Sequence, residues 1–170
     1  LFEQVKLRGS ATWFDSHISD WILWLPTTKG FFSPRNVKDV HSYGVELKAN
    51  VDVRLGRKWA LRLDANYSYT PSINVGEPIS AADRSVGKQL PYVPRHSASL
   101  TGVVAWRGWA FSYMWCHYSE RYTMSSNDLS LTGRLPKYYM SNISLEKSLQ
   151  LRWAELSFKG LVNNIFDEEY

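Results

Sequence analysis

The sequence contains a single cysteine, Cys116, and no long apolar run. One cysteine cannot form an internal disulfide, and no group of Cys and His residues has the spacing of a metal-binding motif. The longest uninterrupted apolar run, Trp21 to Leu25, has five residues, whereas a membrane-spanning helix needs about 20. These absences exclude a disulfide scaffold and a helical membrane protein, and they predict neither a metal nor a cofactor.

The distribution of charge and of histidine argues against two further classes of function. The 20 Lys and Arg residues are spread along the chain, and the longest basic run is Arg57-Lys58, so the clustering expected of a nucleic-acid-binding face is missing. His17, His41, His96 and His117 show no HExxH spacing, and no Gly-x-Ser-x-Gly elbow occurs. We therefore expect no nucleic-acid partner, no catalytic residues and no enzymatic activity.

Alternation of apolar and polar residues dominates the rest of the sequence. Every second residue from Tyr43 to Leu55 is apolar or aromatic, and the same period of two resumes from Trp59 to Tyr69. This period is typical of β-strands with one apolar face. The pattern predicts seven strands, at residues 4–25, 36–54, 59–72, 95–106, 109–123, 137–148 and 151–164.

The connections between these strands alternate in length. Long connections are expected at 26–35, 73–94 and 124–136, and short ones at 56–58, at 107–108 and near 149. A transmembrane barrel has short turns at one end and long loops at the other. The expected strands also exceed the 5–6 residues or so that are usual in globular proteins. Both features favour a membrane barrel over a soluble sheet.

Aromatic residues lie near both ends of the expected strands, as the two interfacial aromatic belts of a membrane barrel require. Four tryptophans lie beside the short turns, namely Trp59, Trp106, Trp109 and Trp153, and four aromatics lie toward the other strand ends, namely Tyr67, Tyr69, Trp115 and Tyr139. The ten residues from Trp59 to Tyr69 span roughly 33 Å, which a tilt near 45° reduces to about 23 Å, close to the apolar band of a barrel. We interpret these eight residues as membrane-interface aromatics. Polar residues of the opposite parity are then expected to face the lumen, namely Lys6, Arg8, Lys48, Arg54, Arg62 and Asp64.

Several segments resemble the carboxy-terminal part of the β-barrel of TonB-dependent outer-membrane receptors. These segments are Tyr43-Gly44-Val45-Glu46, Leu90 to His96 (where the chain passes from a long outer loop into a strand), Tyr118 to Tyr122, and Val162 to Tyr170. The last of them is similar to the family's Asn-Leu-Phe-Asp-Lys-x-Tyr. The resemblance implies an all-β fold, an antiparallel up-and-down transmembrane β-barrel segment of about seven strands from a 22-stranded barrel. Residues 1–170 are then expected to be the carboxy-terminal portion of that barrel, without the plug and the last strand.

The same resemblance implies a function in the outer membrane of a Gram-negative bacterium. The expected activity is active import of a scarce nutrient, such as cobalamin or a ferric siderophore, energised through the TonB complex. The expected partners are outer-membrane lipid, the plug and remaining barrel strands, the TonB complex and a small-molecule ligand. The segment from Ile18 to Ile22, followed by Leu25-Pro26 and Pro34-Arg35-Asn36, resembles vitamin B12 receptors.

Six residues in or beside the long connections are candidate ligand contacts, because loops on a rigid scaffold often carry binding. They are Arg35, Asn36, Asp83, Arg84, Arg121 and Tyr122. Two other interpretations of the chain stay open. The alternation also fits a soluble β-sandwich that binds carbohydrate through exposed aromatics, and it fits a small complete outer-membrane barrel.

Overall fold

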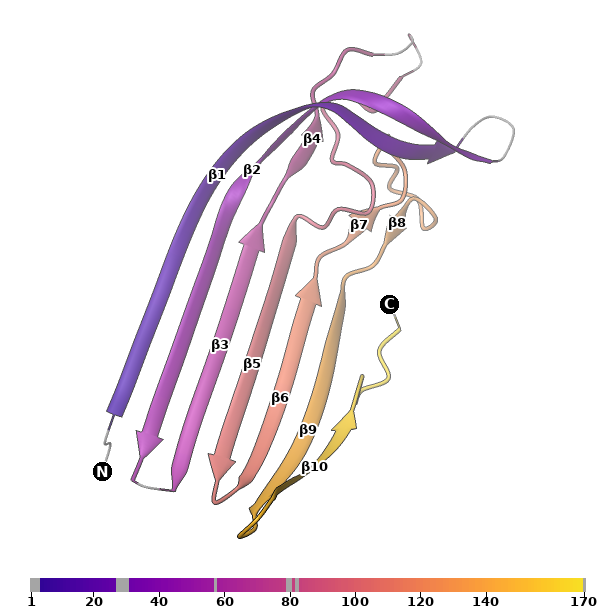
Figure 1. Cartoon of the computed structure of the whole chain (residues 1–170). Helices are drawn as coiled ribbons and strands as arrows, with labels where there is room; N and C mark the ends of the chain where they lie inside the picture. Colours follow the sequence, from indigo (N-terminus) through magenta and orange to yellow (C-terminus); the bar gives the residue numbers. More distant parts are fainter. Residues whose placement is uncertain (1–3, 27–30, 57, 79–80, 82, 170) are drawn as a thin grey trace.

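The computed structural model describes residues 4–26, 31–56, 58–78, 81 and 83–169. Seven long strands form one antiparallel sheet in the order β1-β2-β3-β5-β6-β9-β10 (Figure 1). Their bounds are β1 (Gln4–Pro26), β2 (Phe32–Leu55), β3 (Trp59–Tyr69), β5 (His96–Trp106), β6 (Trp109–Tyr118), β9 (Tyr138–Gln150) and β10 (Glu155–Val162). Among the described residues there is no helix with the length and apolarity to cross a membrane. The expected all-β, up-and-down antiparallel fold is confirmed.

The strand register keeps residues of one character on one face across the whole sheet. Leu63 of β3 lies opposite Val51 of β2 and Gly102 of β5, and Tyr113 of β6 lies opposite Ile143 of β9. On the other face, Arg62 lies opposite Asp52. Since side chains alternate with a period of two, this register separates an apolar face from a polar face. The expected sharing of one face by Lys6, Arg8, Lys48, Arg54, Arg62 and Asp64 is confirmed.

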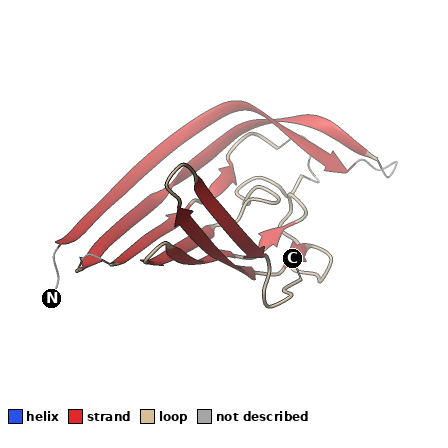
Figure 2. Cartoon of the chain, turned by 60° about the horizontal axis from the view of Figure 1, so that its bottom comes forward, coloured by secondary structure: helices blue, strands red, loops and turns tan. Residues whose placement is uncertain are grey.

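The apolar face is not covered by a second layer. In the described part of the chain, the only buried apolar residues are Val40 and Leu90, whereas Leu7 on the apolar face is 74% exposed. The sheet curves into an arc (Figure 2). A soluble sandwich would bury this face beneath a second sheet, so the structure does not favour that alternative.

The short turns form where glycine and local backbone geometry allow them. Arg107 and Gly108 both have positive φ, 46° and 79°, which a two-residue hairpin turn of type I′ requires. Residues 151–154 also form a turn, closed by the N–H of Leu151 donating to the carbonyl of Ala154 at 2.8 Å. The expected strand at 151–164 therefore begins only at Glu155. In the turn at 56–58, Arg57 lies outside the described residues.

The long connections differ from the sequence-based expectation. β1 continues to Pro26 and β2 begins at Phe32, so residues 26 and 32–35 of the expected loop are paired strand; residues 27–30 lie outside the described part. Asp20 of β1 takes a left-handed φ of 59° and is missing from the paired register of β1 and β2. The far part of the β1–β2 hairpin turns out of line with its lower part (Figure 1). We call the part of this hairpin beyond Asp20 the hairpin extension.

Two expected strands also end early, at prolyl or polar residues. The strand expected at 59–72 ends at Tyr69, because Pro71 lacks an N–H for the ladder, and β4 (Ser72–Asn74) pairs with β2 instead. The strand expected at 109–123 ends at Tyr118, and β7 (Arg121–Tyr122) pairs with β8 (Arg134–Leu135) in a separate small sheet. The interrupted strands place these segments among the long loops.

Candidate functional site

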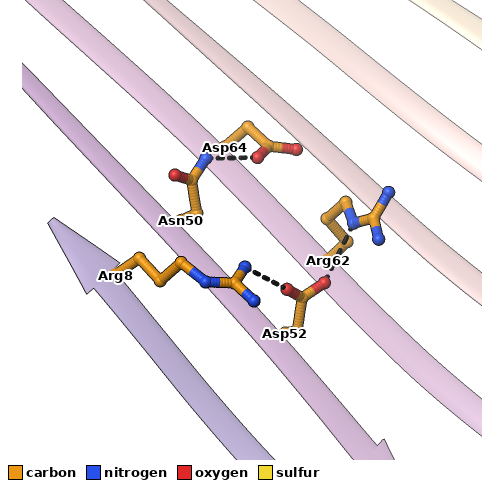
Figure 3. A network of polar contacts seen from close by, with 5 residues as sticks. All are labelled: Arg8, Asn50, Asp52, Arg62 and Asp64. Atoms are coloured by element: carbon orange, nitrogen blue, oxygen red, sulfur yellow. Dashed lines mark hydrogen bonds and ion pairs between the residues drawn. The ribbon is translucent and has the colours of Figure 1, made fainter.

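A network of polar contacts joins three strands on the polar face. Asp52 of β2 accepts from Nε of Arg62 at 2.9 Å and lies 3.5 Å from Nη1 of Arg8 of β1 (Figure 3). One step further along the strands, Asn50 donates to the carboxylate of Asp64 (Figure 3). The two arginine side chains are each 65% exposed. The network therefore fixes side chains on the polar face while leaving them in contact with water.

The polar face is hollowed along β1, β2 and β3. A hollow of about 440 Å³ is lined by a set of charged side chains, namely Lys6, Arg8, Asp52, Arg54 and Arg62. A second hollow of about 310 Å³ lies further along and is lined by polar side chains that include Glu46, Lys48, Asn66, Ser68, Ser97 and Ser99. In the first hollow, cationic groups outnumber the single carboxylate, so this part of the face is suited to an acidic partner.

The long loops are joined to one another by hydrogen bonds. Gln89 is buried, its N–H donates to Oδ1 of Asn127 at 2.9 Å, and its carbonyl accepts from Nδ2 of the same residue at 2.8 Å. Its side chain accepts from the backbone N–H of Ser72 at 3.0 Å. The N–H of Tyr92 donates to the carbonyl of Tyr122 at 2.7 Å. These contacts build a loop platform from the described residues of 75–95 and from residues 119–137, and it is anchored on β4.

Two predicted ligand residues, Arg121 and Tyr122, belong to this loop platform. The guanidinium of Arg121 lies over the ring of Tyr138, 5.0 Å from its centroid, and that ring stacks on Tyr118 at 5.2 Å. The buried Nε of Arg121 has no hydrogen-bond partner among the described residues. The guanidinium is thus held against the ring of Tyr138 within the loop platform, and its positive charge suits an anionic group of a ligand.

The other four candidates are placed differently. Asp83 accepts from the N–H and hydroxyl of Ser85, at 2.9 and 2.6 Å, and Arg84 is exposed beside it. Arg35 and Asn36 lie within β2, opposite Leu23 and Ile22. The expectation that Arg35 lies in a loop is wrong, because β2 begins at Phe32, and Asn36 lies in a strand as expected. The side chains of both residues lie outside the described part.

Sequence reasoning missed the residues that join the loops. No periodic pattern in the sequence marks Gln89, Asn127 or Tyr138 as contact residues, because a contact between segments far apart in the sequence depends on where the fold brings them together. The turn at Asp128 is visible in sequence as Asp-x-Ser: the N–H and the hydroxyl of Ser130 donate to its carboxylate at 3.0 Å each. These hydrogen bonds hold the pKa of Asp128 below its usual value.

The tryptophans beside the short turns form a row on the apolar face. Trp59 lies opposite Trp106, which lies opposite Trp109. The first two rings stack at 5.5 Å, and the ammonium of Lys147 lies over Trp109 at 4.8 Å. Trp153 lies in the turn before β10 and is 85% exposed. Aromatic rings beside cationic groups are typical of a membrane-water interface.

A second aromatic row crosses the apolar face at the other end of the strands. Its members lie on β3, β5, β6 and β9, namely Tyr67, Tyr69, His96, Trp115, His117 and Tyr139. Trp115 stacks with Tyr139 at 6.0 Å, and the hydroxyl of Tyr67 lies 2.9 Å from Nδ1 of His96. Between the two rows, the apolar face carries aliphatic side chains such as Leu63, Val104 and Leu145.

Comparison with solved structures shows the same fold in two transport proteins. The copper transporter OprC has a TM-score of 0.65 and 21% identity, with 97% of this chain and 23% of that chain covered. BauA, the ferric preacinetobactin receptor from Acinetobacter baumannii, has a TM-score of 0.62 and 12% identity, with 94% and 23% covered. The chain thus spans about a quarter of the length of these structures. No curated protein sequence matches it.

A family profile covers nearly the whole sequence. The profile described as TonB dependent receptor-like, beta-barrel matches residues 2–165. That match agrees with the antiparallel sheet, the alternating turn lengths and the two aromatic rows. The chain therefore belongs to the TonB-dependent receptor family, as a segment of its β-barrel.

Proposed function

We propose that this chain is part of the wall of an outer-membrane transporter of a Gram-negative bacterium. The transporter imports a scarce nutrient with energy delivered through the TonB complex. The single observation that carries the proposal is the uncovered apolar face between two aromatic rows, backed by a hollow, charged opposite face. Lipid takes the place of a second protein layer on the apolar face, and the aromatic rows lie at the two membrane interfaces.

The remaining partners follow from the edges and the polar face. β1 and β10 are the edges of the sheet, and an unpaired strand edge is not tolerated in a membrane, so further barrel strands pair with both. Residues 1–170 are then the carboxy-terminal portion of the barrel, before its last strand. The cationic hollow lined by Lys6, Arg8 and Arg62 faces the plug, which supplies acidic groups to it.

The ligand meets the loop platform, with Arg121 and Tyr122 as the principal contacts and Asp83 and Arg84 at its margin. The ligand classes are cobalamin and ferric siderophores, which present amide, carboxylate or other oxygen acceptors to the charged guanidinium of Arg121. Arg35 and Asn36, which lie in the hairpin extension, are further candidate contacts. The neighbours support the import of metal-containing nutrients in general, since one is a copper transporter and the other a ferric preacinetobactin receptor.

The proposal is tested by uptake in cells that carry the receptor. Labelled cobalamin and a labelled ferric siderophore are offered separately, with and without a functional TonB complex. We expect uptake of one of them, lost without TonB. Arg121→Ala should weaken ligand binding to the detergent-purified protein, whereas Lys137→Ala, an exposed residue of the same loop platform, should not. Recovery of the protein as a detergent-free soluble monomer, or uptake that is independent of TonB, would refute the proposal.

A further inference from the structure

Two histidines that lie far apart in the sequence meet on the hairpin formed by β1 and β2. His17 of β1 lies directly opposite His41 of β2 in the strand register. Their rings stack with centroids 4.2 Å apart and 13° between the planes. Asp15 precedes His17 by two residues on the same strand and therefore points to the same face. The three side chains form a cluster at the apolar-face parity, which we call the His-Asp cluster.

Both imidazoles turn a ring nitrogen toward the same carboxylate. Nε2 of His41 lies 3.1 Å from each carboxylate oxygen of Asp15, and Nδ1 of His17 lies 3.6 Å from one of them. One donor atom from each residue lies within 4.8 Å of the others. Around a tetrahedral ion with bonds of about 2.1 Å, neighbouring donor atoms are roughly 3.4 Å apart. The distances to Asp15 already match that separation.

To bind an ion, the cluster needs one further change, a movement of the His17 ring, and His17 is its most exposed member. The side chain of His17 is 70% exposed, compared with 27% for His41. A bound ion requires the ring of His17 to leave its stack on His41, so that both lone pairs point at the ion. A solvent-exposed side chain changes rotamer readily. The more enclosed His41 and the carboxylate thus form a fixed pair, and His17 closes on the ion.

The position of the His-Asp cluster along the strand keeps it outside the hydrocarbon region. Trp13 lies opposite Val45, which lies opposite Tyr69 of the second aromatic row. His17 is four residues beyond Trp13, which is about 13 Å along the strand and about 9 Å along the membrane normal at a tilt of 45°. The cluster therefore meets water and headgroups rather than acyl chains, and an ion can reach it from outside the cell.

We propose that Asp15, His17 and His41 bind one divalent transition-metal ion on the surface of the β1–β2 hairpin. Imidazole with one carboxylate suits Zn²⁺ and Cu²⁺, whereas Ca²⁺ and Mg²⁺ prefer oxygen ligands alone. Water completes the coordination from the open side. Because the ligands come from both strands, the ion cross-links β1 to β2 just before Asp20 and holds the base of the hairpin extension. The site follows from the register of two strands, which no spacing in the sequence reveals.

The test is calorimetric titration of ZnCl₂ into the intact, tag-free receptor in detergent. We expect one ion per chain. His17→Ala and His41→Ala should each weaken Zn²⁺ binding by more than the loss of a residue that only hydrogen-bonds to a metal ligand, which costs roughly 10–100-fold. His96→Ala is the matched control, because that histidine also lies on the apolar face but outside the cluster, and it should bind Zn²⁺ as the unaltered protein does. CaCl₂ should give no binding.

A spectroscopic measurement separates loss of a ligand from loss of folding. With one equivalent of Cu²⁺, paramagnetic resonance should show coupling to two imidazole nitrogens, and each histidine variant should show one. Folding of every variant is checked by its heat-dependent migration in gels. Absence of Zn²⁺ binding, binding unchanged in His17→Ala and His41→Ala when both are folded, or Ca²⁺ binding as tight as that of Zn²⁺ would overturn the proposal.

Discussion

Leu63 is the residue at which a buried charge should do most harm if the apolar face contacts lipid. It lies on β3 four residues from Trp59 and four from Tyr67, opposite Val51 and Gly102. Four residues correspond to about 13 Å along the strand, or about 9 Å along the normal at a tilt of 45°, so Leu63 lies near the membrane midplane. An arginine there should cost about 2–4 kcal/mol.

The matched control places the same charge on the polar face at the same level. Thr101 lies opposite Asp64 in the register, so an arginine at 101 meets water and a carboxylate. We expect Thr101→Arg to change stability by less than about 1 kcal/mol, as exposed ion pairs do. Each variant is folded into phospholipid vesicles, and its unfolding by denaturant is followed by tryptophan fluorescence. Equal penalties for the two variants, or a larger one for Thr101→Arg, would refute the assignment of lipid to the apolar face.

Three further predictions concern the sheet contacts, the ionic network and the loop platform. A Cβ at Gly44 would lie 1.8 Å from the carbonyl oxygen of Tyr69, so Gly44→Ala should destabilise the barrel by about 1–3 kcal/mol. Gly9→Ala is the control, because its Cβ would meet nothing closer than 3.6 Å. This variant should leave the denaturation midpoint almost unchanged. Arg62→Ala should leave the denaturation midpoint almost unchanged in the same assay, because its ion pair is open to water, and a large shift would mean that the polar face is dry. Hydrogen bonds within its own turn depress the pKa of Asp128 below its usual value of 3.8, so the stability that they give is complete above that pH and is lost as the pH falls through the lower folded value. The protection of the amides of residues 128–133 against exchange, relative to the intrinsic rate at each pH, should therefore fall only below about pH 4, and Asp128→Asn should abolish this dependence.

The strands could be predicted because their cause is local. Alternation between Tyr43 and Leu55 and between Trp59 and Tyr69 reports which face each side chain takes, and the strand pairing confirms that assignment in β2 and β3. Strand ends were predicted less well. β3 stops at Tyr69 because Pro71 cannot donate to the ladder, and β2 begins at Phe32, before the expected start at residue 36, because its pairing with β1 continues there.

The candidate ligand site could likewise be predicted only in part. Arg121 and Tyr122 could be predicted to lie near a long loop, but their setting depends on Tyr138, and the contact between Gln89 and Asn127 joins two loops. Such contacts depend on how separate loops are placed relative to one another in the fold, which no single position in the sequence determines.

The amino-acid order alone determined the period of two, the alternation of turn lengths and the aromatic rows, because each arises from neighbours along one strand. Tertiary structure decided what lies beside what. Register placed His17 against His41 and set Arg8 and Arg62 on either side of Asp52. A pairing between strands is fixed by hydrogen bonds to a partner segment, so its consequences appear only when both segments are in place.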